Sequence, residues 1–127
     1  MARTVESVMR RSPVTITPGE TLSAAQELMA REGVRQLPVL EKGMLAGMLS
    51  ERDLHAHTGY LERTKVNVAM TRDVVTVTPA TTAQQAGQLL IDHKFNALPV
   101  VEGEKLVGIV SRTDLLQLLV DLLEQEG

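Results

Sequence analysis

Two short motifs of one type offer chemistry in this chain: Ser50-x-x-Asp53 and Ser111-x-x-Asp114. Each follows an apolar run and precedes a helical pattern, so each aspartate is expected at a strand-to-helix turn. A carboxylate there could accept hydrogen bonds from two neighbouring ligand hydroxyls, and free amides at the helix start could hold an anion. The same spacing is also a helix capping box. Both interpretations are compatible, because serine can cap the helix while aspartate faces a ligand.

The two motifs recur because the chain is duplicated. Residues 9–54 align with residues 70–115 without a gap, at a constant offset of 61. Eighteen of the 46 aligned positions are identical, where unrelated chains would share roughly three. A fixed period predicts two supersecondary units that pack on one another. Any site built by one copy is therefore expected again in the other.

Each copy predicts the element order β-α-β-β-α. Strands are expected at 14–16 and 75–77, then helices capped by Thr21 and Thr82, and then hairpins formed by apolar strands around Gly-containing turns. Gly33 can end the first helix in a left-handed conformation, which costs its counterpart Lys94 more conformational free energy. We expect one compact α/β module of two repeats, 1–66 with the connecting segment and 67–127 with a C-terminal apolar helix.

The last helix is apolar around most of its circumference. Its aliphatic residues are Leu115, Leu116, Leu118, Leu119, Val120, Leu122 and Leu123. Such a helix must be covered on more than one side. In a chain of 127 residues, a second copy is the expected cover, so the sequence predicts a homodimer.

Composition argues against several classes of protein. A net charge of −3 disfavours nucleic-acid binding, which normally needs a basic surface. The chain has no cysteine and no apolar run of about 18 residues that would predict a membrane span, so a cytoplasmic location is expected. No metal site is expected, because His55 and His57 are two apart and point to different sides of a helix. No nucleophile–base set is recognisable, so we do not expect an enzyme.

Beyond these patterns, the chain resembles a known family, the CBS domain pair or Bateman module. The resemblance rests on residues 8–18, Leu37-Pro38-Val39 and Gly47 to Leu54, and on their counterparts 69–79, 98–100 and 108–115. It implies tandem repeats related by pseudo-twofold symmetry. It also implies a regulatory module that needs no obligatory cofactor and binds AMP, ADP, ATP or S-adenosylmethionine in clefts between the repeats. The signal would pass to an unidentified effector protein.

The resemblance also implies which residues contact such a ligand. Each site would join the Ser-x-x-Asp turn of one repeat to the first strand and the loop before the Leu-Pro-Val strand of the other. Site one would be formed by Met48, Ser50, Asp53, Thr78, Ala83, Phe95, Asn96 and Ala97, and site two by Ile109, Ser111, Asp114, Thr17, Leu22, Val34, Arg35 and Gln36.

The two sites are expected to differ. In site one, the Phe95 ring would pack against adenine, or else it is a core aromatic. The Arg52 side chain would reach a phosphate group, or else it is a solvated helix residue. In site two, Arg35 and Arg112 are candidate phosphate partners. Two further differences favour site one for a charged nucleotide: Thr113 replaces Arg52, and Glu20 replaces Thr81.

A second function stays open on the sequence alone. The chain could be a ligand-free scaffold that dimerises and docks on another protein. The final helix would suit that role equally well.

Overall fold

A computed structural model describes residues 3–126 of the chain. These residues form two compact units. One unit is Pro13–Val74, and the other combines the residues up to Ser12 with those from Val75 onward. Both units contain the expected mixture of helices and antiparallel strands.

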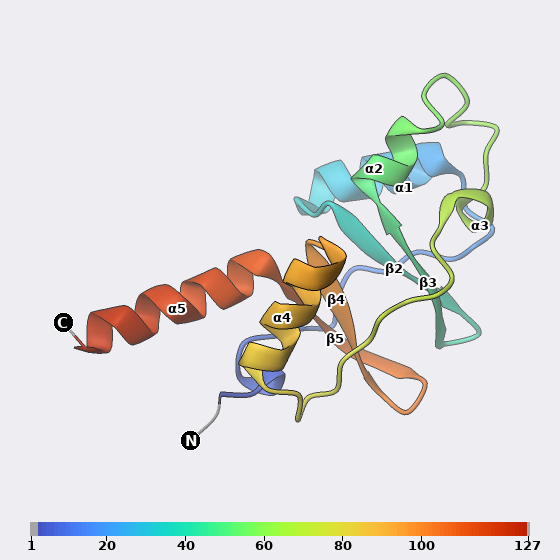
Figure 1. Ribbon diagram of the computed structural model, residues 1–127. Helices are drawn as coiled ribbons and strands as arrows, with labels where there is room; N and C mark the ends of the chain where they lie inside the picture. The colour runs from blue at the N-terminus through green and yellow to red at the C-terminus, as the bar shows by residue number, and fades with distance from the viewer. Residues whose placement is uncertain (1–2, 127) are drawn as a thin grey trace. The chain divides into compact units, whose positions relative to one another are not determined.

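The unit Pro13–Val74 is built around a β-hairpin. Its elements are α1 (Leu22–Glu32), β2 (Gln36–Glu41), β3 (Met44–Ser50), α2 (Glu51–His55) and α3 (Val66–Ala69). Strands β2 and β3 pair antiparallel, and α1 lies beside α2 (Figure 1). The core is aliphatic, as the scarcity of aromatic residues predicts, and Leu22, Leu37, Val39 and Leu49 are fully buried in it.

The other unit repeats this hairpin and adds an edge strand. Its elements are η1 (Val5–Ser7), β1 (Arg10–Arg11), α4 (Ala83–His93), β4 (Ala97–Glu102), β5 (Lys105–Ser111) and α5 (Arg112–Glu126). The sheet order is β1-β5-β4, with both pairings antiparallel. Helix α5 extends well past the hairpin (Figure 1), and none of its described residues is buried.

The helix ends follow the predicted local chemistry. The Thr21 side chain accepts from the Ala24 amide at 3.1 Å, and Thr82 forms a reciprocal capping box with Gln85. Gly33 ends α1 in the left-handed conformation with φ 68°. Lys94 ends α4 in that conformation too, with φ 57°, so the repeat imposes this geometry on a residue that disfavours it.

The predicted strands at 14–16 and 75–77 are wrong in extent. Each is reduced to one parallel bridge, Ile16 to Val39 and Val77 to Val100. The Ile16 amide donates to the Pro38 carbonyl at 3.1 Å. The parallel ladder cannot be extended, because the preceding bond would be donated by Pro38 and the following one by Pro18, and neither has an N–H. Pro99 and Pro79 occupy the same two places around Val77, so the ladder is limited to one residue in both units.

The two copies exchange their leading segments, a name we give to residues 3–12 and 64–73. Val5 is buried against the second copy, where its amide donates to the Thr81 carbonyl at 2.8 Å. Val66 is buried against the first copy, where its amide donates to the Glu20 carbonyl at 2.8 Å. The compact units and the sequence repeats at 1–66 and 67–127 are therefore different divisions of the chain.

Candidate functional site

Both Ser-x-x-Asp turns form complete capping boxes. The Ser50 amide donates to Asp53 Oδ2 at 2.8 Å, and the Asp53 amide donates to Ser50 Oγ at 3.2 Å. The same bonds join Ser111 and Asp114 at 2.8 and 3.1 Å. The capping interpretation of the motif is confirmed in both copies.

Capping leaves each aspartate with further hydrogen-bonding capacity. Only Oδ2 of Asp53 and of Asp114 accepts a hydrogen bond within residues 3–126, and both side chains are half-buried rather than enclosed. A carboxylate has about four acceptor positions on its two oxygens. Each turn can therefore keep its cap and still accept a ligand hydroxyl through Oδ1. The expected contact with a diol stays a prediction.

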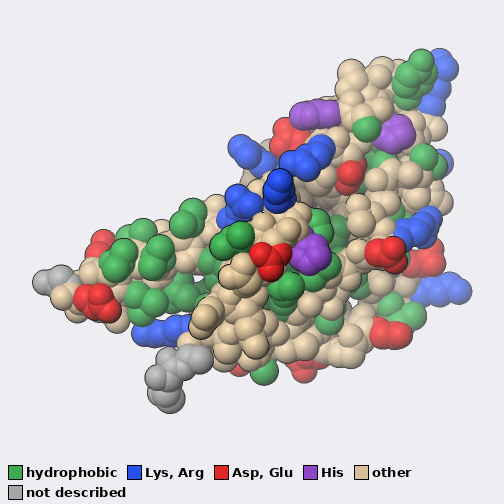
Figure 2. Space-filling view, viewed as in Figure 1, with side chains coloured by type: hydrophobic (Ala, Val, Ile, Leu, Met, Phe, Trp, Pro, Cys, Tyr) green, Lys and Arg blue, Asp and Glu red, His purple; other side chains and the backbone are tan. Residues whose placement is uncertain are grey.

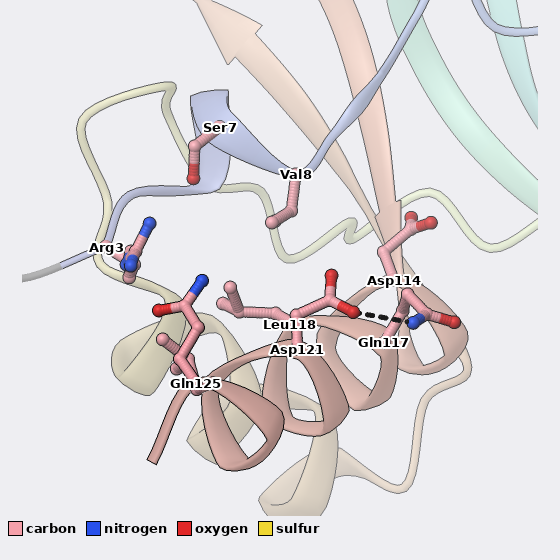
Figure 3. A pocket seen from close by; sticks show the side chains of 9 residues that line it. Arg3, Ser7, Val8, Asp114, Gln117, Leu118, Asp121 and Gln125 are labelled. Carbon is pink, nitrogen blue, oxygen red and sulfur yellow. Dashed lines mark hydrogen bonds between the residues drawn. The ribbon is translucent and has the colours of Figure 1, made fainter. Parts of the chain in front are cut away.

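Asp114 also lines a pocket of about 370 Å³ that lies within one compact unit. The pocket is formed by the leading segment and by one face of α5, through Arg3, Ser7, Val8, Asp114, Gln117, Leu118, Asp121, Leu122 and Gln125. Figure 3 shows Arg3 and Gln125 at one end and Asp114 at the other. Its volume lies near the lower limit of small-molecule sites, at roughly 300–1,000 Å³.

The pocket combines charge of both signs with an apolar lining. Arg3 supplies a guanidinium, Asp114 and Asp121 supply carboxylates, and Val8 and Leu118 supply aliphatic surface. One carboxylate is already engaged, because the Gln117 amide nitrogen donates to Asp121 Oδ1 at 2.9 Å (Figure 3). This arrangement suits an amphipathic ligand with hydroxyl groups and an apolar portion.

Among the residues that line the pocket, Asp114 alone is a site residue predicted from the sequence. The pocket exists because α5 runs on to Glu126, whereas its counterpart α2 ends at His55. The longer apolar pattern after Asp114 was a signal of that extension. The opposite wall comes from the exchanged leading segment, and neither periodicity nor motif spacing indicates such an exchange.

Phe95 lies in an exposed loop and is not a core aromatic. Its residue is 36% exposed, and its ring stacks on His93 with centroids 5.1 Å apart and an interplanar angle of 14°. Arg112 holds this loop, because its Nε donates to the Phe95 carbonyl at 2.8 Å and its amide donates to the Asn96 carbonyl at 2.9 Å. A phosphate would therefore have to use the terminal nitrogens of Arg112.

The corresponding loop of the other unit is joined to its turn by the same backbone bond and carries an exposed ion pair. The Glu51 amide donates to the Arg35 carbonyl at 2.9 Å, and the Arg35 and Glu51 side chains approach to 3.8 Å. Both positions thus hold their loop through the backbone amide, and only the side chain of Arg112 adds a hydrogen bond to a loop carbonyl, because the exposed pair of Glu51 with Arg35 contributes little. Glu51 also competes with any phosphate for the Arg35 guanidinium.

The predicted site residues are divided between the two units. Thr17, Leu22, Val34, Arg35, Gln36, Met48, Ser50, Arg52 and Asp53 belong to Pro13–Val74, and Thr78, Ala83, Phe95, Asn96, Ala97, Ile109, Ser111, Arg112 and Asp114 belong to the other unit. Within each unit, the structure places the Ser-x-x-Asp turn against the loop before the Leu-Pro-Val strand through the amide–carbonyl bonds of Glu51 and Arg112. Leu22 is fully buried in its own core. The assembly of each complete predicted site stays a prediction.

Two further features of the described part of the chain concern other kinds of function. Within residues 3–126, no three His, Asp or Glu side chains are grouped so that they could hold a metal ion. Within the same residues, no helix has the length and apolar character needed to cross a membrane.

Comparison with known proteins gives a family match to both halves of the chain. The model for the CBS domain matches residues 5–57 and again residues 65–121. The chain is similar to the CBS domain-containing protein YhcV of Bacillus subtilis, with 35% identity over 114 residues that cover 87% of this chain and 81% of YhcV.

Solved structures share the fold over nearly the whole chain. The CBS-pair protein CBSX2 of Arabidopsis thaliana superimposes with a TM-score of 0.89 and 27% identity, covering 98% of this chain and 99% of that one. A crystal structure of CBSX2 in complex with AMP gives a TM-score of 0.87 and 29% identity, covering 94% of this chain and 98% of that one. The expected α/β fold with two repeats is confirmed.

Proposed function

Because this chain belongs to the CBS domain family, with two CBS repeats over most of its length, we propose that it is a regulatory module for an adenine-containing ligand. AMP, ADP, ATP and S-adenosylmethionine are the candidates. The observation that carries the proposal is the crystal structure of the similar protein CBSX2 in complex with AMP. The proposed output is a change in the interaction with an effector protein, without chemical conversion of the ligand.

The two Ser-x-x-Asp turns are the proposed ribose contacts. Asp53 and Asp114 keep an oxygen that their caps do not use, and a charge-assisted bond from a ribose hydroxyl to that oxygen would be shorter and stronger than a neutral one. At the start of α5 the amides of Ser111, Arg112 and Asp114 already donate within the unit, so the carboxylate of Asp114 is the proposed ligand contact of this turn. The remaining contacts are those that the family resemblance implies.

The two turns are proposed to differ in ligand preference. The Arg52 side chain is exposed and follows the Ser50 turn, whereas Thr113 occupies that position after Ser111. Glu20 is exposed where Thr81 stands in the other copy. The site centred on Asp53 is therefore proposed to take the more highly charged nucleotide.

Binding can be tested by isothermal titration calorimetry and thermal melts of the full chain with the four ligands. A ligand at 100 times its Kd adds about 2.7 kcal/mol to native stability, which raises Tm by several degrees for a domain of this size. We expect at least one of the four to bind and to be recovered unchanged. If none releases heat or moves Tm at millimolar concentration, the ligand-free scaffold is the better description.

A further inference from the structure

The C-terminal end of α4 carries two aromatic rings that contact each other. The side chains of His93 and Phe95 stack with centroids 5.1 Å apart and an interplanar angle of 14°, which is the offset arrangement that aromatic pairs favour. Residues 91–96 are all exposed, and Figure 2 shows a histidine side chain, in purple, on the surface at this end of α4. The two rings therefore depend on each other for their orientation, because no core surrounds them.

The backbone of this turn is fixed on both sides of the Phe95 ring. Lys94 adopts the left-handed conformation, and its amide donates to the Ile91 carbonyl at 3.3 Å. The Phe95 amide donates to the Leu90 carbonyl at 3.1 Å, which completes a Schellman motif. The Phe95 carbonyl accepts from Arg112 Nε at 2.8 Å. Both polar backbone groups of Phe95 are thus bonded, and rotation of its side chain is the main freedom that remains.

The other copy has the same turn without the ring pair. Its Val34 amide donates to the Met29 carbonyl at 3.0 Å, which is the counterpart of the bond made by the Phe95 amide. The positions of the two rings are taken by Glu32 and Val34, and Glu32 forms an exposed ion pair with Arg31 at 3.8 Å. Both copies therefore share the backbone turn, and only the second copy presents an aromatic face on it.

We propose that His93 is a positioning residue for adenine binding, because its imidazole holds the Phe95 ring in one orientation before the ligand arrives. This inference rests on the proposed function, in which Phe95 contacts adenine. His93 covers one face of the ring, so the base stacks on the other face. A ring that is already oriented loses less rotational freedom on binding, which raises the affinity. The site that includes Phe95 then binds the base more tightly than the site that has Val34.

The ring pair is tested first without a ligand. The ring current of Phe95 shifts the NMR signals of a ring stacked on it upfield, so Phe95→Ala should move the signals of the His93 ring protons downfield. Ile91→Ala is the control, because it removes another exposed side chain of α4 and leaves both rings in place, and it should move these signals much less. Unchanged His93 signals in Phe95→Ala would show that the rings do not stack in solution, and would overturn the inference whether or not AMP binds.

The role in binding is tested by calorimetric titration of the full chain with AMP. His93→Asn keeps a polar side chain but removes the ring, and we expect the AMP Kd at one site to rise about 2- to 5-fold. His93→Phe supplies a new stacking ring, so its Kd should stay within about twofold of that of the unmodified chain. Adding His93→Asn to Phe95→Ala should have no further effect, because His93 acts only through the Phe95 ring.

Each of these titrations has an outcome that contradicts the positioning role. An unchanged AMP Kd in His93→Asn would mean that the histidine only stabilises the end of α4, where it suits the helix dipole. The role is also wrong if His93→Phe binds as weakly as His93→Asn, or if His93→Asn keeps its full effect in Phe95→Ala. Circular dichroism checks that every variant folds. If the unmodified chain does not bind AMP while Phe95→Ala still shifts the His93 signals, the proposed function fails together with the positioning role, and the contact between the rings stands.

Discussion

A Cβ atom added to Gly108 would lie 2.9 Å from the carbonyl oxygen of Arg10, in the leading segment at the start of the chain. The Sδ atom of Met9 would lie equally close. Gly47 has the same relationship with the second leading segment, since its added Cβ would lie 2.7 Å from the Thr71 carbonyl oxygen. Both glycines recur in the duplication because an exchanged segment crosses directly over each of them.

Replacing either of these glycines should destabilise the fold. In Gly108→Ala and Gly47→Ala, the methyl group meets a backbone carbonyl that cannot move away cheaply, and we expect a loss of about 1–3 kcal/mol in the free energy of unfolding. Gly19→Ala is the matched control, because its Cβ would meet nothing within 4 Å. Urea denaturation gives the three values. Equal stability of Gly19→Ala and Gly108→Ala would contradict the close crossing.

The capping boxes predict that each aspartate acts on both stability and affinity. Asp53→Ala and Asp114→Ala remove the acceptor of the Ser50 or Ser111 amide, which should cost about 1 kcal/mol of stability. They also remove the proposed bond to the ribose, so AMP affinity at that site should fall roughly 10- to 100-fold. Calorimetry at a temperature where the variants are fully folded separates the two effects.

A control for this prediction lies in α4. Gln85 has the same position in its capping box, where it accepts from the Thr82 amide at 3.0 Å, and it is not a proposed ligand contact. Gln85→Ala should lower stability by about as much as the aspartate variants and leave AMP affinity unchanged. If all three variants bind AMP equally well, the aspartates are caps and nothing more.

The exposed ring of Phe95 predicts a change in binding with little change in stability. Base–aromatic stacking is worth about 1–3 kcal/mol, and one face of the ring is already covered by His93. We therefore expect Phe95→Ala to weaken AMP binding at one site by about 5- to 10-fold. Ile91→Ala removes an apolar side chain of α4 that is more exposed than Phe95, at 66% against 36%, and it should not alter affinity. A titration in which both variants bind AMP like the unmodified chain would remove Phe95 from the site.

The two left-handed helix ends predict that exchanging glycine and lysine changes stability in opposite directions. Lys94→Gly removes the backbone strain of a non-glycine residue at φ 57°. Glycine also makes the unfolded chain more flexible, which offsets part of this benefit, so we expect the free energy of unfolding to rise by about 0.5–1 kcal/mol. Gly33→Lys imposes that strain on α1 and should cost about the same amount. Thermal unfolding of the two variants measures both. A loss of stability in Lys94→Gly would mean that contacts of the lysine side chain outweigh the backbone strain.

The sequence by itself determined those features that depend on residues close together in the chain. Thr21 and Thr82 cap their helices through bonds to residues three positions away, and the two Ser-x-x-Asp motifs do the same. The hairpins followed from apolar runs around short turns. The family also followed from the motifs, because both copies carry them in the same order.

Only the tertiary structure decided which distant segments meet. It showed that Val5 packs with the second copy and Val66 with the first, and that Phe95 is exposed. It also showed that the side chains at the equivalent positions 112 and 51 differ, since Arg112 donates to a loop carbonyl whereas Glu51 lies in an exposed ion pair. A segment's choice of partner depends on the free energy of contacts made across the whole fold, and residue type and local spacing do not encode those contacts individually. The apolar character of α5 depends on both the sequence and the fold. Its leucines are visible in the sequence, whereas the side of the helix that stays exposed is defined only once the rest of the unit has packed.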